Sequence, residues 1–273
     1  MADDEAKVLA AARKLPLRER LDHKAWKARS EACEEIRTSA ESAAEGAASL
    51  DELAALLPAA VADANANVVD KALEAAAAVL ARCRDPAAAS AAESLCKSIG
   101  AKCLAARAGT VKKTEEVLLL LVEAEQGAVV VDALIAGFGH KVPKAAAAAV
   151  NITLAVYTEF GARAVKPQPV LKALPGLFDS KDAKVRDAAK ALTVVLSRWV
   201  GRELVESALL EKMREAMRKD VAELLDGLPA EKPKAARLTR KEAAKKAAKA
   251  AAAAPEGDVA AAPAAGGAAP AGA

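Results

Sequence analysis

Few residues in this chain could carry out catalysis, and they do not form a known catalytic pattern. The sequence has two histidines, His23 and His140, and four cysteines, with no C-x-x-C pair and no cluster of histidines. It also lacks the phosphate-binding, H-E-x-x-H, nucleophile-elbow and dinucleotide motifs. The run Gly137-Phe138-Gly139 follows a helical pattern and no strand. We therefore expect no catalytic residue, no metal site and no cofactor, and we expect the thiols to be buried in helices.

The remaining chemistry is that of a binding surface built from short polar breaks in the sequence. Four of the five breaks carry basic side chains, and one of these also carries a tryptophan. If the breaks line up in space, they form one basic edge suited to an acidic partner. Any one of these lysines alone is an ordinary solvated residue. The candidates are Lys24, Trp26, Lys27, Arg29, Asn65, Asn67, Lys112, Lys113, Lys141, Lys144, Lys181, Lys184 and Arg186.

Trp26 is the most distinctive of these candidates. Its neighbours are polar and basic, so the indole is predicted to stand in a turn outside any apolar stripe. Trp199 instead follows Leu192 and Leu196 at helical spacing, which predicts a core position. A large aromatic ring in a charged turn is typical of an interface anchor. Arg186 has a structural alternative, because it could pair with an aspartate of a neighbouring repeat.

The breaks recur at helical-repeat spacing and define the elements that must position these side chains. They separate the two helices of successive pairs and are spaced by roughly 32 to 45 residues, close to the period of HEAT repeats. We therefore predict an all-α fold, an α-solenoid of about six HEAT repeats. The predicted turns are Ala25–Trp26, Ala64–Asn67, Gly109–Val111, His140–Pro143 and Ser180–Ala183.

Local signals and composition support this reading. Asp182 is a predicted helix N-cap, Pro143 suits a first helical turn, and Gly161 and Gly201 are predicted to end helices. Hydrophobic residues make up 53% of the chain but aromatic residues only 2%. Such a core must consist of small aliphatic side chains at close helix separations, which argues against an all-β sandwich.

Charge and periodicity predict three segments. Residues 1–14 form an N-terminal extension, residues 15–228 the solenoid, and residues 229–273 a Lys/Ala-rich disordered linker. The net charge is +3, and the segment from 231 onward, with eight Lys/Arg against four Asp/Glu, carries +4, which leaves the first 230 residues at −1. No run of 18 apolar residues lacks charge, so we expect no membrane contact and an intracellular, soluble protein.

Three stretches carry a resemblance to a known family. They are LRERLDHKAWKAR (17–29), ADANANV (62–68) and the long run 166–200, with Pro167, Phe178, Asp182, Arg186 and Trp199 at matching places. Together they resemble the first TOG domain of the chTOG/Dis class of microtubule polymerases. The run GTVKKT (109–114) is similar to plant and algal members.

This resemblance implies a flat paddle whose turns within repeats bind the αβ-tubulin heterodimer. By position, it implies that Trp26 packs on β-tubulin and that Arg186 engages α-tubulin, with Lys27, Arg29 and Lys184 beside them. Asn65 and Asn67 fall in the second turn, Lys112 and Lys113 in the third, and Lys141 and Lys144 in the fourth. It further implies a monomeric domain of a larger polymerase that acts at microtubule plus ends, in the cytoplasm and at the spindle.

Two other functions stay open at this stage. A general HEAT scaffold would bind protein partners through groove helices and not through turns. A nucleic-acid binder would use the basic edge and tail, but the sequence lacks stacking aromatics and the solenoid is almost neutral, so we expect no nucleic acid.

Overall fold

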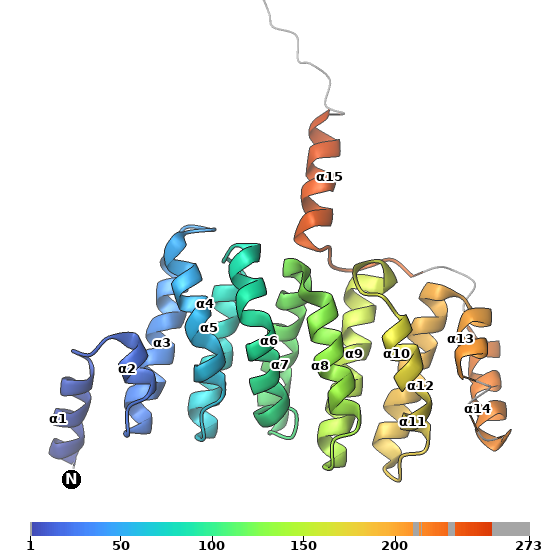
Figure 1. The fold of residues 1–273 in the computed structure, drawn as a ribbon, viewed down its shortest axis with the longest axis horizontal. Coiled ribbons are helices and arrows are strands. Elements are labelled where there is room, and N and C mark those ends of the chain that lie inside the picture. The colour runs from blue at the N-terminus through green and yellow to red at the C-terminus, as the bar shows by residue number, and fades with distance from the viewer. Residues whose placement is uncertain (1, 210–212, 214, 229–232, 253–273) are drawn as a thin grey trace, which may run out of the picture.

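The computed structural model describes residues 2–209, 213, 215–228 and 233–252, and these are helical with no strand among them. The helices form two layers that run side by side along the molecule (Figure 1). They are α1 (Ala2–Ala12), α2 (Leu17–Leu21), α3 (Trp26–Ser42), α4 (Ala48–Val61), α5 (Ala66–Leu80), α6 (Asp85–Lys102), α7 (Ala108–Leu121), the π-helical η1 (Val122–Gln126), α8 (Gly127–Phe138), α9 (Pro143–Ala164), α10 (Gln168–Ala173), α11 (Pro175–Phe178), α12 (Ala183–Val200), α13 (Arg202–Leu209), α14 (Glu215–Asp226) and α15 (Arg240–Ala252).

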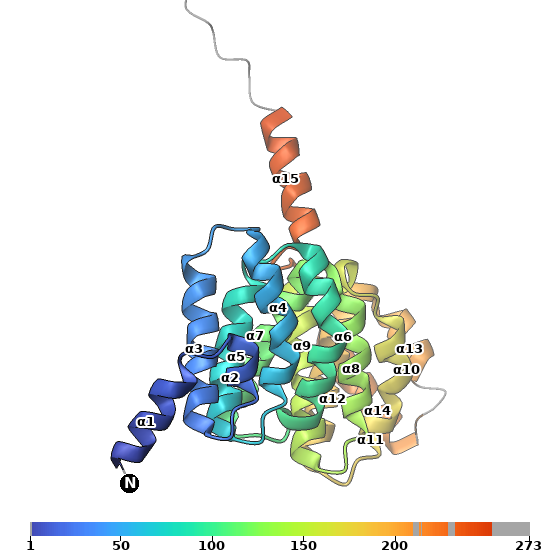
Figure 2. The ribbon, with the colours of Figure 1, turned by 60° about the vertical axis from the view of Figure 1, so that its left-hand side comes forward.

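Consecutive helices form antiparallel pairs, as the repeat spacing predicted. The pairs are α2 with α3, α4 with α5, α6 with α7, α8 with α9, and α11, which follows the short α10, with α12; α13 and α14 come last, and both contact α12. First helices form one layer and second helices the other (Figures 1 and 2). Within the described residues this is the expected α-solenoid of six HEAT repeats. The connections within pairs lie along one edge, at the bottom of Figure 1, which we call the turn edge.

The core that holds the layers together is aliphatic and rich in alanine. Ala32, Ala72, Ala88 and Ala149 are fully buried at the contacts between helices. Small side chains let helix axes approach closely, and the many short-range contacts that result replace the bulk of aromatic rings. The four cysteines are buried and free, as predicted. Burial raises the pKa of the Cys33 and Cys96 thiols to about 12, so both are unreactive hydrophobic side chains.

Trp199 packs against this core, as predicted, but stays half-buried. Its indole lies over Gly161, where a Cβ atom would stand 2.7 Å from the ring. Gly161 was predicted to end its helix, but α9 continues to Ala164. With a φ of 73°, outside helical geometry, Gly161 kinks α9 near its end instead. Gly201, with a φ of 95°, ends α12 as predicted.

One predicted turn is misplaced. The third turn was expected at Gly109–Val111, but α6 continues to Lys102 and α7 begins at Ala108. Gly109 therefore lies in the first turn of α7, where a helix tolerates glycine more readily than in its centre. Lys112 and Lys113 consequently lie on α7 itself, and Arg107 takes the N-cap position.

No membrane-spanning helix is expected from the sequence, but α9 is long and apolar enough to cross a membrane by length and composition. The most apolar window of this helix is 61% buried inside the molecule. Its Ala145, Val150 and Tyr157 pack against neighbouring helices. Burial within the solenoid explains the hydrophobicity of α9.

Described residues on both sides of the predicted solenoid contact it. In the N-terminal extension, Glu5 of α1 forms an ion pair with Lys27 of α3, and Arg13, just after α1, forms one with Glu31 of α3. In the expected disordered linker, residues 233–240, which we call the C-terminal strap, lie against the solenoid. The strap precedes α15, whose described residues project from the edge opposite the turn edge (Figures 1 and 2). Residues 229–232 and 253–273 lie outside the described residues.

Two arginines attach the strap. The Arg237 guanidinium donates to Glu123 at 2.6 Å and lies 5.4 Å from the centre of the Phe160 ring, while its backbone N–H donates to the Glu159 carbonyl. Arg240 donates to Asp85 at 2.8 Å and to the carbonyl oxygens of Cys83 and Leu80. These bonds join the strap to α5, α6, η1 and α9. Periodicity could not reveal them, because they involve charges and backbone atoms and not a row of large apolar residues.

Removal of the Arg237 side chain should destabilise the solenoid. The variant Arg237→Ala loses charge-assisted bonds worth about 1 to 2 kcal/mol, which in a domain of this size lowers the thermal midpoint by about 2 to 8 °C. Circular dichroism melting measures this change. Lys245→Ala on the exposed face of α15 is the control and should melt with the wild type. Equal melting of the two variants would contradict a stabilising strap.

Candidate functional site

The connections on the turn edge share one local hydrogen bond. In four of them, a side chain two residues before the N-cap accepts the backbone N–H of the N-cap residue. The acceptors are His23 Nδ1 (3.0 Å, from Ala25), Asp63 Oδ1 (2.7 Å, from Asn65), His140 Nδ1 (3.0 Å, from Val142) and Ser180 Oγ (3.3 Å, from Asp182). This bond fixes the path of the backbone before each second helix, so the side chains that follow are held in preformed positions.

Trp26 is the first residue of α3 and is 39% exposed, as its polar surroundings predicted. The Lys27 ammonium lies 6.0 Å from the centre of the indole and forms an ion pair with Glu5 of α1 at 2.6 Å. Lys27 is therefore partly committed to an internal contact. The indole ring itself presents a large apolar surface at one end of the turn edge.

Arg29 and Arg186 occupy equivalent places in the first and fifth repeats. Each donates to two carbonyl oxygens of its own turn, Arg29 to His23 and Lys24, and Arg186 to Ser180 and Lys181. Both guanidinium groups thus stiffen the turn they follow. Among the described residues, Arg186 forms no ion pair with an aspartate of a neighbouring repeat, which was the other role predicted for it.

Arg29, in contrast, makes that inter-repeat pair. Its guanidinium binds both Asp63 carboxylate oxygens, at 2.5 and 3.0 Å, and both side chains are largely buried. Burial alone would raise the pKa of Asp63, but the bonds from Arg29 and from the backbone N–H of Asn65 hold it below its usual value. This geometry gives Arg29 an internal role, joining the first turn to the second, that the sequence did not foresee.

In the second turn, Asn65 caps α5, since its side-chain oxygen accepts the Asn67 backbone N–H at 2.9 Å. The Asn67 side chain is exposed on the turn edge. Of the two predicted candidates in this turn, Asn65 therefore shapes the turn and Asn67 is free to contact a partner.

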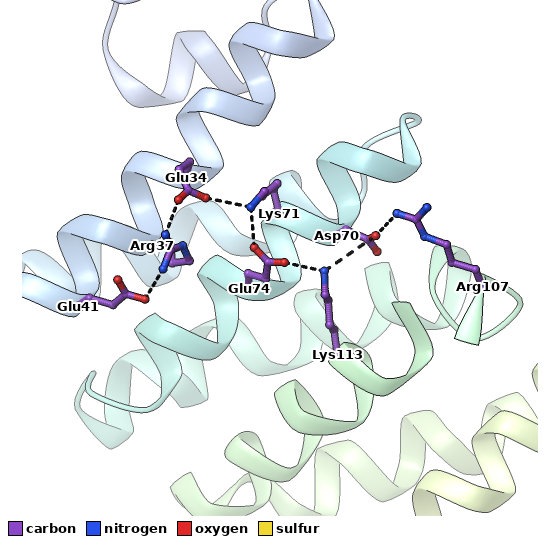
Figure 3. A network of polar contacts seen from close by, with 8 residues as sticks. All are labelled: Glu34, Arg37, Glu41, Asp70, Lys71, Glu74, Arg107 and Lys113. Atoms are coloured by element: carbon purple, nitrogen blue, oxygen red, sulfur yellow. Dashed lines mark hydrogen bonds and ion pairs between the residues drawn. The ribbon is translucent and has the colours of Figure 1, made fainter. Parts of the chain in front are cut away.

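The third repeat departs most from expectation, because its charges take part in a network on the second-helix layer (Figure 3). Lys113 forms an ion pair with Glu74 at 2.6 Å, and Arg107 with Asp70. Burial by itself would raise the pKa of Asp70, yet hydrogen bonds from Thr110 and Arg107 hold that pKa low. The network continues through Lys71 and Glu34 and so links α5 and α7 to α3.

Lys113 is therefore a poor candidate for contact with a partner, whereas Lys112 is exposed one helical turn inside α7. Arg107, which the sequence analysis missed, is exposed at the third turn. The available signal was the position of Arg107 between two helices, since α6 ends at Lys102 and α7 begins at Ala108. The signal was missed because the third turn was placed at Gly109–Val111.

The fourth and fifth turns supply the remaining candidates. Lys141 and Lys184 are exposed and have no ion pair among the described residues. The Lys144 ammonium donates to the Ala106 carbonyl at 2.5 Å, which joins the fourth turn to the third. Val142 was missed by the sequence analysis and is 44% exposed at the tip of the fourth turn. An apolar residue between Lys141 and Pro143 was the available signal, of the same kind that marked Trp26.

The turn edge thus combines an exposed indole, an exposed valine and free ammonium groups on a rigid support. It has the composition of a recognition surface for an acidic protein partner. Among the residues that the structure describes, no three His, Cys, Asp or Glu side chains come together as a metal site. The fold and this edge define the class of the protein, a HEAT-repeat solenoid whose turns within repeats lie along one edge.

Comparison with known proteins identifies the family. Residues 11–225 match the family described as XMAP215/Dis1/CLASP, TOG domain. The chain therefore belongs to this family, and residues 11–225 form a TOG domain.

Relatives agree with this assignment. Protein MOR1 of Oryza sativa is 40% identical over 85% of the chain, and Protein MOR1 of Arabidopsis thaliana is 39% identical over the same share. The chain spans 12% of the length of each. Spindle pole body component alp14 of Schizosaccharomyces pombe is 33% identical over 84% of the chain and 29% of its own length. Plant proteins among these relatives fit the resemblance carried by residues 109–114.

Two solved structures share the fold. One, described as showing tubulin recruitment and assembly by microtubule polymerases with TOG domain arrays, has a TM-score of 0.75 at 21% identity, over 85% of this chain and 50% of the other. The other, TOG3 of Drosophila melanogaster Mini spindles, has a TM-score of 0.65 at 19% identity, over 82% and 99%. At these identities the likeness concerns the fold.

Loss of the Asp63 carboxylate should destabilise the first two turns in a pH-dependent way. Asp63→Asn leaves Arg29 without its buried partner, so we expect the free energy of unfolding at pH 7 to fall by about 2 to 4 kcal/mol. Because the folded-state pKa of Asp63 is lowered, its contribution is complete above the unfolded pKa of about 3.9 and is lost as the pH falls further. Urea unfolding at pH 7 and at pH 3 should therefore show a smaller difference from wild type at pH 3.

Asp22→Asn is the matched control. Asp22 is exposed in the first turn and has no ion pair among the described residues, so this change should leave unfolding close to wild type at both pH values. A difference for Asp63→Asn that stays constant with pH would show that the ion pair is not its cause.

Proposed function

We propose that the turn edge binds the αβ-tubulin heterodimer. The observation that carries this proposal is a single basic edge with an exposed tryptophan in its first turn and Arg186 in its fifth, on a domain of the TOG family. The solved TOG structures described above include one named for tubulin recruitment, which supports the same partner. The bound dimer would lie along the edge, in contact with several turns at once.

Each part of the edge has a distinct task in this proposal. The Trp26 indole is the apolar anchor on β-tubulin, where loss of such an anchor typically costs about 2 to 4 kcal/mol. Arg186 engages α-tubulin at the other end, so the two contacts fix the orientation of an elongated partner. Lys112, Lys141 and Lys184 attract an acidic surface. They mainly raise the rate of association and contribute less to the affinity.

Within a full-length protein, this domain would be one tubulin-binding unit of a multi-TOG polymerase that promotes growth and organisation of microtubules at their plus ends. Polymerase activity would need several such units, so the domain alone binds soluble tubulin as a monomer without driving growth. Its site would be the cytoplasm, on microtubules and at spindle poles, in line with relatives named for the spindle pole body and mini spindles.

The same proposal assigns no enzymatic reaction, cofactor, nucleic acid or membrane to this domain. A general HEAT scaffold is the second candidate, favoured by the apolar groove between α6 and α8, a space of about 540 Å³ lined by Cys96, Val129 and Ala133. A scaffold of that kind would bind through helix faces, and its binding would not depend on Trp26.

A negative charge introduced at the anchor tests the proposal. Trp26→Glu should abolish co-elution with unpolymerised tubulin on a size-exclusion column, and Arg186→Ala should weaken it about tenfold or more. Each variant must first give the circular dichroism spectrum of the wild type. Leu204→Glu on α13 is the matched control, since Leu204 is also apolar, is 45% exposed and lies away from the turns.

Co-elution of Trp26→Glu and Arg186→Ala at wild-type level would refute binding through the turn edge. A wild-type domain that does not bind tubulin would favour the scaffold.

A further inference from the structure

A groove opens beside the turn edge, and only the lysines at its mouth take part in the contacts proposed so far. It lies between the N-terminal halves of α7 and α9 and reaches the start of α12, with a volume of about 660 Å³. Its floor is apolar and its rim is charged. The residues that matter here are Val111, Lys112, Glu115, Lys144, Ala148 and Asn151.

The groove exists because α7 is linked differently to its two neighbours in the second-helix layer, α5 and α9. Helices α3, α5 and α7 are linked by the network of Glu34, Lys71, Glu74 and Lys113 (Figure 3). Helices α7 and α9 have no such link among their described N-terminal residues. Near their opposite ends, Arg237 of the strap connects η1, just after α7, to α9. The two helices are thus tied at one end, and towards the turn edge the bond from Lys144 to the Ala106 carbonyl, just before α7, joins them outside any ion-pair network.

The side chains that α9 presents to this opening are too short to close it. Ala147 and Ala148 lie one helical turn after Lys144, and Ala148 is only 9% exposed, so they form a floor and not a filling. Val111 of α7 faces them, half-buried. The groove is enclosed enough to change the pKa of a carboxyl group on its rim. Burial raises the pKa of Glu115, and Glu116 and Glu159 raise it further by smaller amounts.

The mouth of the groove at the turn edge is positive. Lys112 and Lys184 stand there without an ion pair among the described residues, and Lys144 projects between them. The Asp182 carboxylate at the same place is used to cap α12, where it accepts the backbone N–H groups of Lys184 and Val185. The N-termini of α7, α9 and α12 also point their positive dipole ends this way.

We propose that this groove is a second contact for tubulin, filled by a segment of the heterodimer in which an Asp or Glu carboxylate stands beside a large apolar side chain. The carboxylate meets the lysines at the mouth and the apolar side chain lies on the alanine floor. This inference rests on tubulin binding at the turn edge. A phosphate-bearing partner fits less well, because the floor offers no polar group to a sugar or a base.

Photo-crosslinking tests which molecule enters the groove. Asn151 is exposed within the groove, and Ala89 is exposed on α6 in the other layer. The substitution Asn151→p-benzoylphenylalanine should give an adduct with unpolymerised tubulin, on a peptide with an acidic residue next to an apolar one. Ala89→p-benzoylphenylalanine should give none. An adduct of the domain with itself would show that a second copy fills the groove, and would overturn the proposal.

Affinity provides the second measurement. Ala148→Phe fills the floor and should weaken tubulin binding about tenfold, whereas Ala89→Phe adds the same ring elsewhere and should bind as wild type. Thermal melting checks that both variants are folded. If Ala148→Phe does not fold, the presence or absence of the Asn151 adduct with tubulin tests the proposal alone.

The outcomes separate this inference from the proposed function. If wild type binds, Trp26→Glu does not, and Ala148→Phe binds normally without an Asn151 adduct, the groove proposal is wrong and the turn edge stands. If wild type does not bind tubulin, both fail.

Discussion

The close approach of stacked helix pairs fixes the position of every functional side chain in this domain. Alanine at the buried contacts allows this approach, and successive turns are thereby brought into one line. The turns add their own bond, from a side chain to the N-cap backbone N–H, so that neither the stack nor the turn leaves the backbone much freedom. An interface on such turns can bind without the entropic cost of ordering loops.

The charges of the domain divide into two sets. One set forms ion pairs within the domain that hold neighbouring repeats together. These pairs are Arg29 with Asp63, Lys113 with Glu74 and Arg107 with Asp70. The other set, with Lys112, Lys141 and Lys184, stays free on the turn edge. The free lysines make the edge basic although the solenoid as a whole is almost neutral.

Sequence reasoning reached the repeat architecture, the exposed position of Trp26 and the cap at Asp182, because each depends on local chemistry or on a long period. It misplaced the third turn because a glycine in the first turn of a helix resembles a break. It could not separate Lys112 from Lys113, since the partners of Lys113 come from a helix about 40 positions earlier. The strap was not predicted for the same reason, because the acidic partner of Arg237, Glu123, lies more than 100 residues away in the sequence.

Hydrogen–deuterium exchange of the domain, alone and with unpolymerised tubulin, tests most directly the claim that recognition occurs on the turns. Tubulin should slow exchange at the backbone amides of the turns around Trp26, Asn67, Lys141 and Arg186, and in the first turns of α7 and α9. The outer faces of α4, α6 and α8 should be unchanged. Protection confined to those faces, with the turns unaffected, would contradict the account.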